Sequence, residues 1–304
     1  MSLYHKYRPK TLEELSGNKQ TITTLNKMLS DSEKTPHTYL LTGPTGCGKT
    51  TIARIIATRL NSTGSDFREI NSADFRGIET VRDIIKQIRY QPLESACRVW
   101  LIDECHKMTG DAQNAMLKIL EDTPNHVYFI LCTTEPHKLI ATIKNRCSVF
   151  TVEPLSDLQM RNLLKKIAKA ENEIIKAKVL DQIILDSLGH ARQAIQILEQ
   201  VLAVEPELRL KVAKKSAEEQ SQSIELCRAL MKGGIPWKSV SNILKGIKEQ
   251  DPENTRRHVL GYAQSVLLNG DQERAGLILE EFIEPFYTSG FPGLVLACYM
   301  VVKN

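Results

Sequence analysis

A glycine-rich segment at residues 43–50 reads GPTGCGKT and fits the phosphate-loop pattern GxxxxGK[ST]. In such a loop, backbone N–H groups converge on an anion at the start of a helix, where the helix dipole favours negative charge. Lys49 would reach the β and γ oxygens of a nucleoside triphosphate, and the Thr50 hydroxyl would ligate Mg²⁺. An ordinary Gly/Pro turn is the alternative. The residues expected to line the nucleotide are Thr45, Gly46, Cys47, Gly48, Lys49, Thr50 and Thr51.

Two acidic residues, Asp103 and Glu104, follow the apolar run VWLI at residues 99–102. A buried parallel strand ending here would place both carboxylates at the edge of the sheet where α/β folds bind ligands. Asp103 would hold the metal ion or its waters, and Glu104 would orient and deprotonate the attacking water. Two acidic residues that merely end a strand are the alternative. Together the two segments predict that the chain binds a nucleoside triphosphate with magnesium and hydrolyses it.

Strand and helix patterns alternate through the first half of the chain. Short apolar segments recur at residues 39–42, 67–70, 99–102, 127–132 and 149–152, with helical periodicity between them. This alternation predicts an α/β fold, in which helices cover both faces of a parallel sheet. After Pro154 only helical patterns follow. We therefore expect three domains: a nucleotide-binding domain at 1–154, a small helical domain at 155–205 and an all-helical domain at 206–304.

Composition is that of an ordinary water-soluble protein. The 304 residues carry a net charge of +4, which is compatible with a nucleic-acid partner but too weak to establish one. Seven cysteines are scattered without a C-x-x-C pair, which supports neither a zinc module nor a disulfide framework. The N-terminus has no apolar signal core, and the longest apolar stretch, 293–302, is too short to span a bilayer. These features predict reduced thiols and a cytoplasmic location, with no membrane partner.

Seven segments of the sequence form a recognisable set: YRP at 7–9, the phosphate loop, NSADFRGIETVR at 71–82, DECH at 103–106, MTGDAQNAMLKILEDTP at 108–124, TTEP at 133–136 and NRC at 145–147. Together they resemble the AAA+ clamp-loader ATPases, namely the bacterial tau/gamma subunits and the small subunits of replication factor C. The resemblance covers about residues 3–200 in order and with similar spacing.

The resemblance implies an AAA+ P-loop domain, a helical lid and a C-terminal helical collar that mediates oligomerisation. It implies ATP and Mg²⁺ as cofactors. It also implies an ATPase subunit of an open ring, formed with copies of itself and other loader subunits, that opens a sliding clamp on binding ATP. Primer-template DNA would then trigger hydrolysis and release of the clamp. The implied setting is the cytosol of a bacterium or a phage-infected host.

Site residues carried over from the resemblance extend beyond the phosphate loop. Arg146 matches the arginine finger that acts on ATP bound by a neighbouring subunit, although Asn145 replaces the family's serine beside it. Arg192 matches the second sensor, on the lid, and Thr133 or Thr134 matches the first sensor. Residues 61–66 lack the four-cysteine zinc insert of the bacterial chains. The segment that packs against the adenine corresponds to Tyr4, Tyr7, Arg8, Pro9, Leu15 and Ser16.

DNA contacts are expected from positive charge on and beside one predicted helix. A stripe of this kind can neutralise phosphates without reading bases, although a solvated helix face is an equal alternative. The exposed apolar turn at 90–93 lies where clamp loaders touch the clamp, but it can equally be a small packing cluster. The residues expected to contact DNA are Arg76, Arg82, Lys86 and Arg89, together with Thr109 and Gln113 at the start of the next helix.

Two other functions fit parts of the pattern. DECH at 103–106 is also compatible with a DNA-translocating motor, either a DEAH-like helicase or a branch-migration motor. A two-motor helicase needs a second nucleotide-binding sheet, which nothing after residue 152 supplies, so the branch-migration type is the remaining motor. The third possibility is a non-catalytic scaffold subunit. A degenerate ATP site is disfavoured by the presence of Lys49, Thr50, Asp103, Glu104 and Arg146.

Overall fold

The computed structural model describes residues 1–31, 35–70, 78–220, 222–270 and 272–303. It divides into two compact units. The α/β unit comprises residues 5–159 and 190–192, and the helical unit comprises residues 1–4, 160–189 and 193–304. The predicted boundaries at 154/155 and 205/206 stay predictions.

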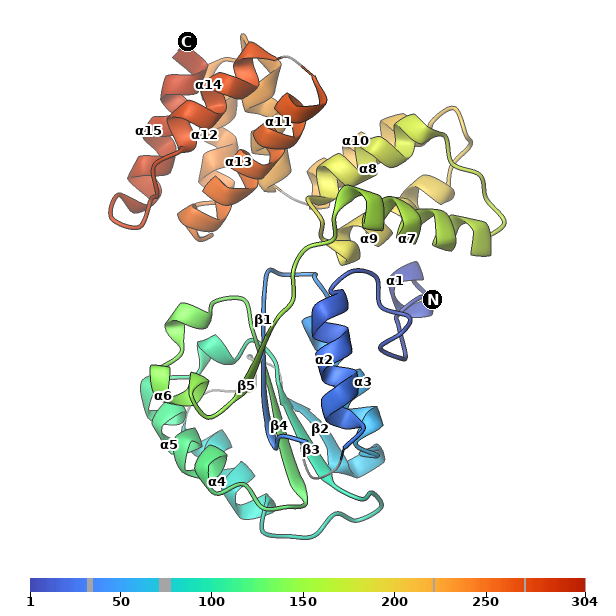
Figure 1. Ribbon diagram of the computed structural model, residues 1–304. Helices are drawn as coiled ribbons and strands as arrows, with labels where there is room; N and C mark the ends of the chain where they lie inside the picture. The colour runs from blue at the N-terminus through green and yellow to red at the C-terminus, as the bar shows by residue number, and fades with distance from the viewer. Residues whose placement is uncertain (32–34, 71–77, 221, 271, 304) are drawn as a thin grey trace. The chain divides into compact units, whose positions relative to one another are not determined.

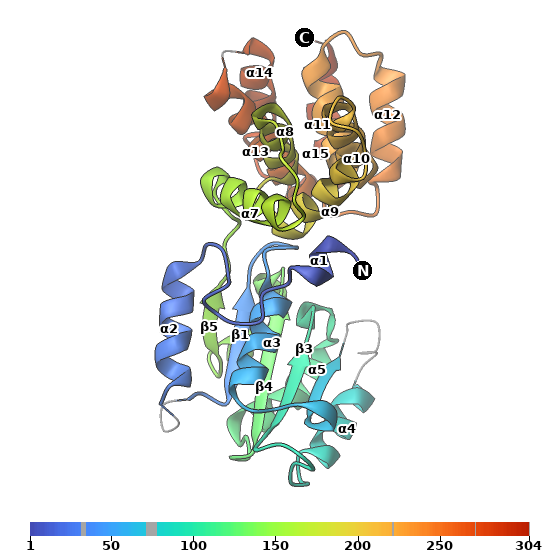
Figure 2. The ribbon, with the colours of Figure 1, turned by 90° about the vertical axis from the view of Figure 1, so that its right-hand side faces the viewer.

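The α/β unit is built on one five-stranded parallel sheet in the order β2-β3-β4-β1-β5. Figure 2 shows β5, β1, β4 and β3 side by side. Within a residue or two at each end, the five strands lie where the apolar segments predicted them, which confirms the α/β fold class. They are β1 (Thr38–Thr42), β2 (Phe67–Ile70), β3 (Arg98–Ile102), β4 (Val127–Thr133) and β5 (Ser148–Thr151).

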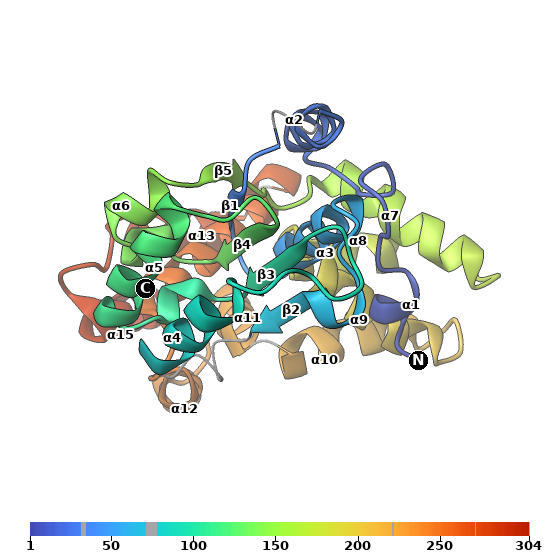
Figure 3. The ribbon, with the colours of Figure 1, turned by 90° about the horizontal axis from the view of Figure 1, so that it is seen from below.

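Helices cover both faces of this sheet (Figures 1 and 3). On one face Tyr39 and Leu41 pack with Ile52 and Ile56, and on the other Leu40 packs with Met116. Neighbouring residues of β1 thus serve opposite cores, because side chains alternate along a strand, and a strand covered on both sides must be apolar throughout. The helices are α2 (Lys19–Leu29) and α3 (Lys49–Arg59) on the first face, and α4 (Ile78–Gln87), α5 (Gly110–Glu121) and α6 (Ala141–Lys144) on the second.

Short 3-10 turns shape the connections near the sheet: η1 (Gly64–Asp66), η2 (Cys105–Lys107) and η3 (Pro136–Lys138). The turns η2 and η3 follow β3 and β4 directly. Since β3 and β4 are parallel neighbours, both turns begin at the same edge of the sheet. This edge therefore collects the side chains that follow each strand.

The helical unit contains no strand among its described residues. An ion pair between the buried Asp186 on α8 and the partly buried Arg228 on α11 joins segments on either side of the predicted boundary at residue 206. No described helix is long and apolar enough to cross a membrane. The helices outside the sheet region are α1 (Leu3–Lys6), α7 (Asp157–Ala170), α8 (Ala177–Ser187), α9 (Ala191–Leu202), α10 (Arg209–Gln220), α11 (Gln222–Lys232), α12 (Trp237–Gly246), α13 (Pro252–Asn269), α14 (Glu273–Phe282) and α15 (Gly290–Lys303).

Candidate nucleotide-binding site

The phosphate loop runs from the end of β1 to the start of α3, as the motif predicts. Gly43 has φ 146°, and a Cβ there would lie 2.1 Å from the carbonyl oxygen of Val152, so no other residue fits. Gly48 caps α3 with φ 104°, a left-handed conformation that costs glycine little. The backbone therefore turns sharply into α3, with the free N–H groups of the helix start facing the loop.

Lys49 curls back over the loop. Its Nζ donates to the carbonyl oxygens of Gly43 and Pro44, each at 2.9 Å, and the residue is only 5% exposed. Phosphate oxygens accept stronger hydrogen bonds from an ammonium group than neutral carbonyls do. The side chain is thus already beside the loop, held by partners that an anion can replace.

Thr50 and Asp103 bring two hard oxygen donors together. Thr50 Oγ1 donates to Asp103 Oδ2 over 2.8 Å, and the backbone N–H of Glu104 donates to Asp103 Oδ1 over 2.9 Å. This pair suits Mg²⁺, which takes one or two protein oxygens and completes its octahedron with phosphate oxygens and waters. Among the described residues, no group of three or more His, Cys, Asp or Glu could hold a metal ion.

Glu104 and Thr134 meet at the ends of adjacent strands. Thr134 Oγ1 donates to Glu104 Oε2 over 3.1 Å. Glu104 has φ 51° and ψ 43°, a left-handed conformation that costs a non-glycine residue roughly 1–3 kcal/mol, so surrounding contacts must maintain it. Of the two threonines considered as the first sensor, Thr134 is the one whose hydroxyl contacts Glu104. The hydroxyl of Thr133 instead accepts a hydrogen bond from the backbone of Glu135.

Residues 190–192 lie on the phosphate loop. His190 Nδ1 hydrogen-bonds to the carbonyl oxygen of Thr45, and the backbone N–H of Arg192 donates to that of Gly46 over 3.4 Å. Burial lowers the pKa of His190, although the bond to Thr45 opposes this effect. The start of α9 is therefore next to the loop, which is where the second-sensor assignment of Arg192 needs it. The sequence pattern gave no indication of the contact made by His190.

A hydrogen bond joins the N-terminal segment to the same region. Arg8 Nε donates to Thr51 Oγ1 over 3.1 Å, which ties the segment to the first turn of α3. Tyr7, Pro9, Leu15 and Ser16 are half-buried in the α/β unit, whereas Tyr4 belongs to the helical unit. Roles for these residues against the adenine stay predictions.

Cys47, inside the phosphate loop, is 9% exposed. Burial raises the pKa of its thiol to about 11, despite the opposing charge of Lys49. The thiol is therefore protonated at neutral pH and unreactive as a nucleophile. Its position supports only a role in lining the loop.

Arg146 lies just beyond α6, on the surface of the α/β unit. Its Nη2 pairs with Glu121 Oε2 at 3.0 Å and its Nη1 donates to the carbonyl oxygen of Thr142 over 3.2 Å. In the contacts of the described residues, the Arg146 side chain meets α5 and α6 and not the phosphate loop of its own chain, while its carbonyl oxygen accepts from Thr38 Oγ1 in β1. That placement is compatible with action on a neighbouring copy.

The basic stripe is weaker than the sequence suggested. Arg82 pairs with Glu79 at 2.6 Å and Lys86 pairs with Asp83 at 3.1 Å, so an acid one turn earlier offsets each charge. Arg89 is exposed but lies beyond the end of α4. Arg76 lies outside the described residues.

Thr109 and Gln113 act within the protein. Thr109 caps α5, because its hydroxyl accepts from the backbone N–H of Ala112 over 3.3 Å. Gln113 is 5% exposed; its amide nitrogen donates to the carbonyl oxygens of Met108 and Lys138, and its amide oxygen accepts from Ile140. The structure therefore does not support Gln113 as a DNA contact, because its backbone N–H and its amide group are all engaged.

The turn at 90–93 is exposed, and hydrogen bonds to a buried carboxylate hold its backbone. The side chains of Tyr90 and Leu93 are 69% and 75% exposed. Beneath them, Asp66 accepts hydrogen bonds from the backbone N–H groups of Leu93, Glu94 and Ser95. Asp66 also pairs with Arg98 at 3.1 Å. Burial opposes ionisation of Asp66, but the N–H groups, led by that of Glu94, and Arg98 outweigh it and lower its pKa to about 2.

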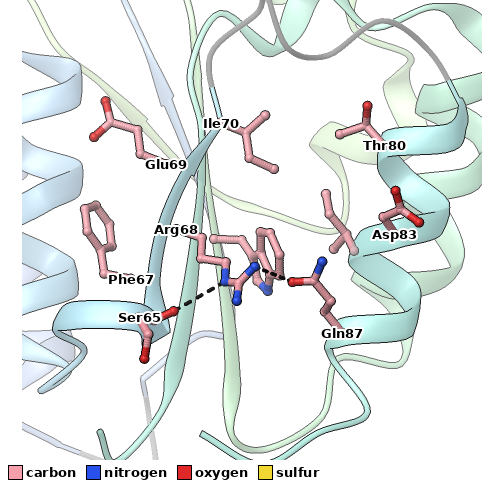
Figure 4. Close-up of a pocket in the computed structure, with 10 residues that line it drawn as sticks. Ser65, Phe67, Arg68, Glu69, Ile70, Thr80, Asp83 and Gln87 are labelled. Atoms are coloured by element: carbon pink, nitrogen blue, oxygen red, sulfur yellow. Dashed lines mark hydrogen bonds between the residues drawn. The ribbon is translucent and has the colours of Figure 1, made fainter. Parts of the chain in front are cut away.

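A separate hollow of about 520 Å³ lies between β2 and α4 (Figure 4). Arg68 crosses it, donating to the Ser65 carbonyl and the Gln87 side chain. Its guanidinium also lies 5.5 Å from the centroid of the Trp100 ring. None of the described residues that line this hollow belongs to the predicted nucleotide site, so the two are distinct.

Comparison with known proteins agrees with this geometry. Family models described as "DNA polymerase III, delta subunit" and "Sigma-54 interaction domain" match residues 63–156 and 15–80. The gamma/tau subunit of DNA polymerase III from Mycobacterium tuberculosis H37Rv is 34% identical over 226 residues, which is 67% of this chain and 39% of that protein. The tau subunit from Escherichia coli K12 is 33% identical over 66% of this chain and 34% of its own length.

Among solved structures, the Thermotoga maritima RuvB Holliday junction branch migration motor matches with a TM-score of 0.60 at 20% identity. The match covers 79% of this chain and 85% of that one. The sheet order, the phosphate loop and the acidic pair after β3 define a P-loop protein of the AAA+ class. Within that class, the chain belongs to the clamp-loader family, although it spans only about two fifths of the length of the first curated relatives.

Proposed function

We propose that this chain is an ATPase subunit of a sliding-clamp loader. The observation that carries the proposal is the pairing, at one edge of the sheet, of Thr50 with Asp103 and of Glu104 with Thr134 beside a phosphate loop. Family membership supports the same reading. Because the chain spans only part of its relatives, its activity and partners are inferred from its own residues.

ATP binds at the phosphate loop in this proposal. Lys49 exchanges its two carbonyl partners for phosphate oxygens, and Thr50 and Asp103 hold Mg²⁺. The metal, when bound, neutralises charge that develops on the phosphates during transfer. Arg8 fixes the N-terminal segment against α3, where that segment can cover the base.

Hydrolysis depends on Glu104. Its carboxylate accepts the proton of the attacking water, while Thr134 fixes the orientation of the carboxylate. Arg192 approaches the γ-phosphate from the start of α9. In these roles Glu104 acts on the nucleophile, whereas Lys49 and Arg192 offset charge on the leaving phosphates.

Arg146 acts in trans on ATP bound by a neighbouring subunit in an open ring. Its pair with Glu121 is partly exposed, with side-chain exposures of 29% and 61%. Exposed pairs of this kind contribute only about 0–1 kcal/mol, so Glu121 can release the guanidinium at little cost when an interface forms. Copies of this chain and other loader subunits are the partners that such a ring requires.

DNA and clamp contacts lie on α4 and the turn that follows it. Arg82, Lys86 and Arg89 are exposed and would meet phosphates of primer-template DNA, with the acidic neighbours Glu79 and Asp83 limiting the affinity. Tyr90 and Leu93 present apolar area that fits a sliding clamp. The free thiols of all seven cysteines support a reducing cytosol as the location.

A steady-state ATPase assay with and without primer-template DNA and sliding clamp tests the proposal. We expect strong joint stimulation by DNA and clamp. Strand displacement driven by ATP would instead indicate a branch-migration motor. Absence of ATP binding and of hydrolysis under every condition would indicate a non-catalytic scaffold subunit.

A further inference from the structure

His106 lies between two carboxylates at the edge of the sheet that carries Glu104. Its side chain is only 6% exposed. Nδ1 lies 3.3 Å from Glu104 Oε2, and Nε2 lies 3.2 Å from Glu135 Oε1. Neither the binding of ATP nor the roles assigned above uses this imidazole, so its burial against Glu104 requires its own explanation.

The imidazole takes part in a closed set of hydrogen bonds. The backbone N–H of Glu135 donates to Thr133 Oγ1 over 3.0 Å, and Thr133 Oγ1 lies 3.1 Å from His106 Nδ1. Burial lowers the pKa of His106, although Glu104 and Glu135 oppose this, and the neutral ring is favoured. With its proton on Nε2, the ring accepts from Thr133 and donates to Glu135, which satisfies every member of the set.

Glu135, which accepts the hydrogen bond from His106, is itself held by Lys138. Lys138 Nζ lies 2.7 Å from Glu135 Oε2, the carboxylate oxygen that does not face His106. The charge and the hydrogen bond of Lys138 help to lower the pKa of Glu135 against the opposing effect of burial. Glu135 is therefore a fixed, ionised acceptor for the imidazole.

The set joins the turn after β3 to the end of β4. Glu104 occupies a left-handed backbone conformation, so contacts outside the turn must maintain it. Thr134, the residue after β4, and His106, in η2, both lie beside the same oxygen, Glu104 Oε2. Thr134 holds this oxygen by a hydrogen bond. His106, whose Nδ1 carries no proton in this arrangement, acts on it by fixing the turn to residues 133–135 and by occupying the space beside it.

We propose that His106 is a positioning residue for hydrolysis, which holds the Glu104 carboxylate beside Thr134 by fixing the β3 turn to residues 133–135. The inference rests on the proposed function, in which Glu104 activates water. Lys49 and Thr50 are held by other partners, Gly43, Pro44 and Asp103. His106 should therefore affect turnover and not the affinity for ATP.

A crystal structure of the full chain carrying His106→Ala tests the geometry without any assay of activity. We expect the bond of 3.1 Å between Thr134 Oγ1 and Glu104 Oε2 to be lost or the Glu104 side chain to adopt several rotamers. An unchanged bond with a single rotamer would overturn the inference. This readout stays valid even if the wild-type chain proves not to hydrolyse ATP, which would refute the proposed function alone.

Kinetics separate positioning from folding. For His106→Ala we expect kcat to fall about 10- to 100-fold, as for small misplacements of reacting groups, with the Kd for ATP unchanged within about twofold. His106→Gln, whose amide can still donate to Glu135, should restore most of kcat. His137→Ala is the matched control, because His137 is 70% exposed and lies 3.7 Å from the same Glu135 carboxylate. Wild-type kcat in His106→Ala, or an effect on ATP affinity alone, would refute the proposal.

Discussion

Replacing Asp66 by Asn should destabilise the α/β unit far more than an ordinary surface mutation. Asp66 is fully buried and Arg98 is 4% exposed, and the two are paired at 3.1 Å. The mutation leaves the Arg98 guanidinium buried without a counter-charge. Removing one partner of a buried pair costs about 3–5 kcal/mol, because the remaining charge is uncompensated. We expect a loss of that size in the free energy of unfolding.

Glu69→Gln is the matched control. Glu69 pairs with Arg54 at 2.7 Å, but the Arg54 side chain is 44% exposed, so its loss should cost only about 0–1 kcal/mol. Urea unfolding can be followed by fluorescence in a Trp237→Phe background, which leaves Trp100, on β3, as the single tryptophan. Equal destabilisation by the two mutations would refute the argument that burial makes the Asp66 pair important.

Two further predictions concern the predicted arginine finger, Arg146, and the pH dependence of stability. Arg146→Ala should keep ATP binding but lower turnover in the assembled complex by about 10³-fold or more, which is the size of effect that loss of an arginine finger has. The control is Arg161→Ala, which removes a surface ion pair with Asp181 and should leave turnover unchanged. Normal turnover by an assembly built entirely of the Arg146 variant would contradict the finger role. Because the pKa of Asp66 is lowered from 3.8 to about 2, its contribution to stability is present above about pH 4 and is lost as the pH falls toward 2. Wild type should therefore lose more stability than Asp66→Asn between pH 4 and pH 2, and parallel stability curves over that interval would be inconsistent with this assignment.

The fold was predictable because parallel strands buried on both faces are apolar throughout. Tyr39, Leu40 and Leu41 show the principle, since each serves one core or the other. The ends of β3 and β4 were predictable for the same reason, and they bring Glu104 and Thr134 together. The carboxyl ends of parallel strands mark the edge of the sheet where α/β proteins bind ligands.

Contacts between distant segments could not be predicted in the same way. The pairs of Arg82 with Glu79 and of Lys86 with Asp83 are not of this kind, because residues three apart on one helix are neighbours and their spacing can be read in the sequence. A polar residue at the start of a helix, such as Gln113, is expected to be exposed. Its burial follows from its hydrogen bonds to Lys138 and Ile140 in the turn before α6, which the sequence does not show. The buried positions of Asp66, Arg98 and His106 likewise depend on partners that have no fixed spacing from them in the sequence.

Equilibrium binding of ATP with Mg²⁺ and single-turnover hydrolysis, measured on wild type and Glu104→Gln, test the central claim most directly. We predict that both proteins bind ATP with similar affinity and that only the wild type hydrolyses it, with a difference in rate of about 10²-fold or more. Wild-type chain that fails to bind ATP, or a Glu104→Gln variant that hydrolyses it at the wild-type rate, would contradict the account.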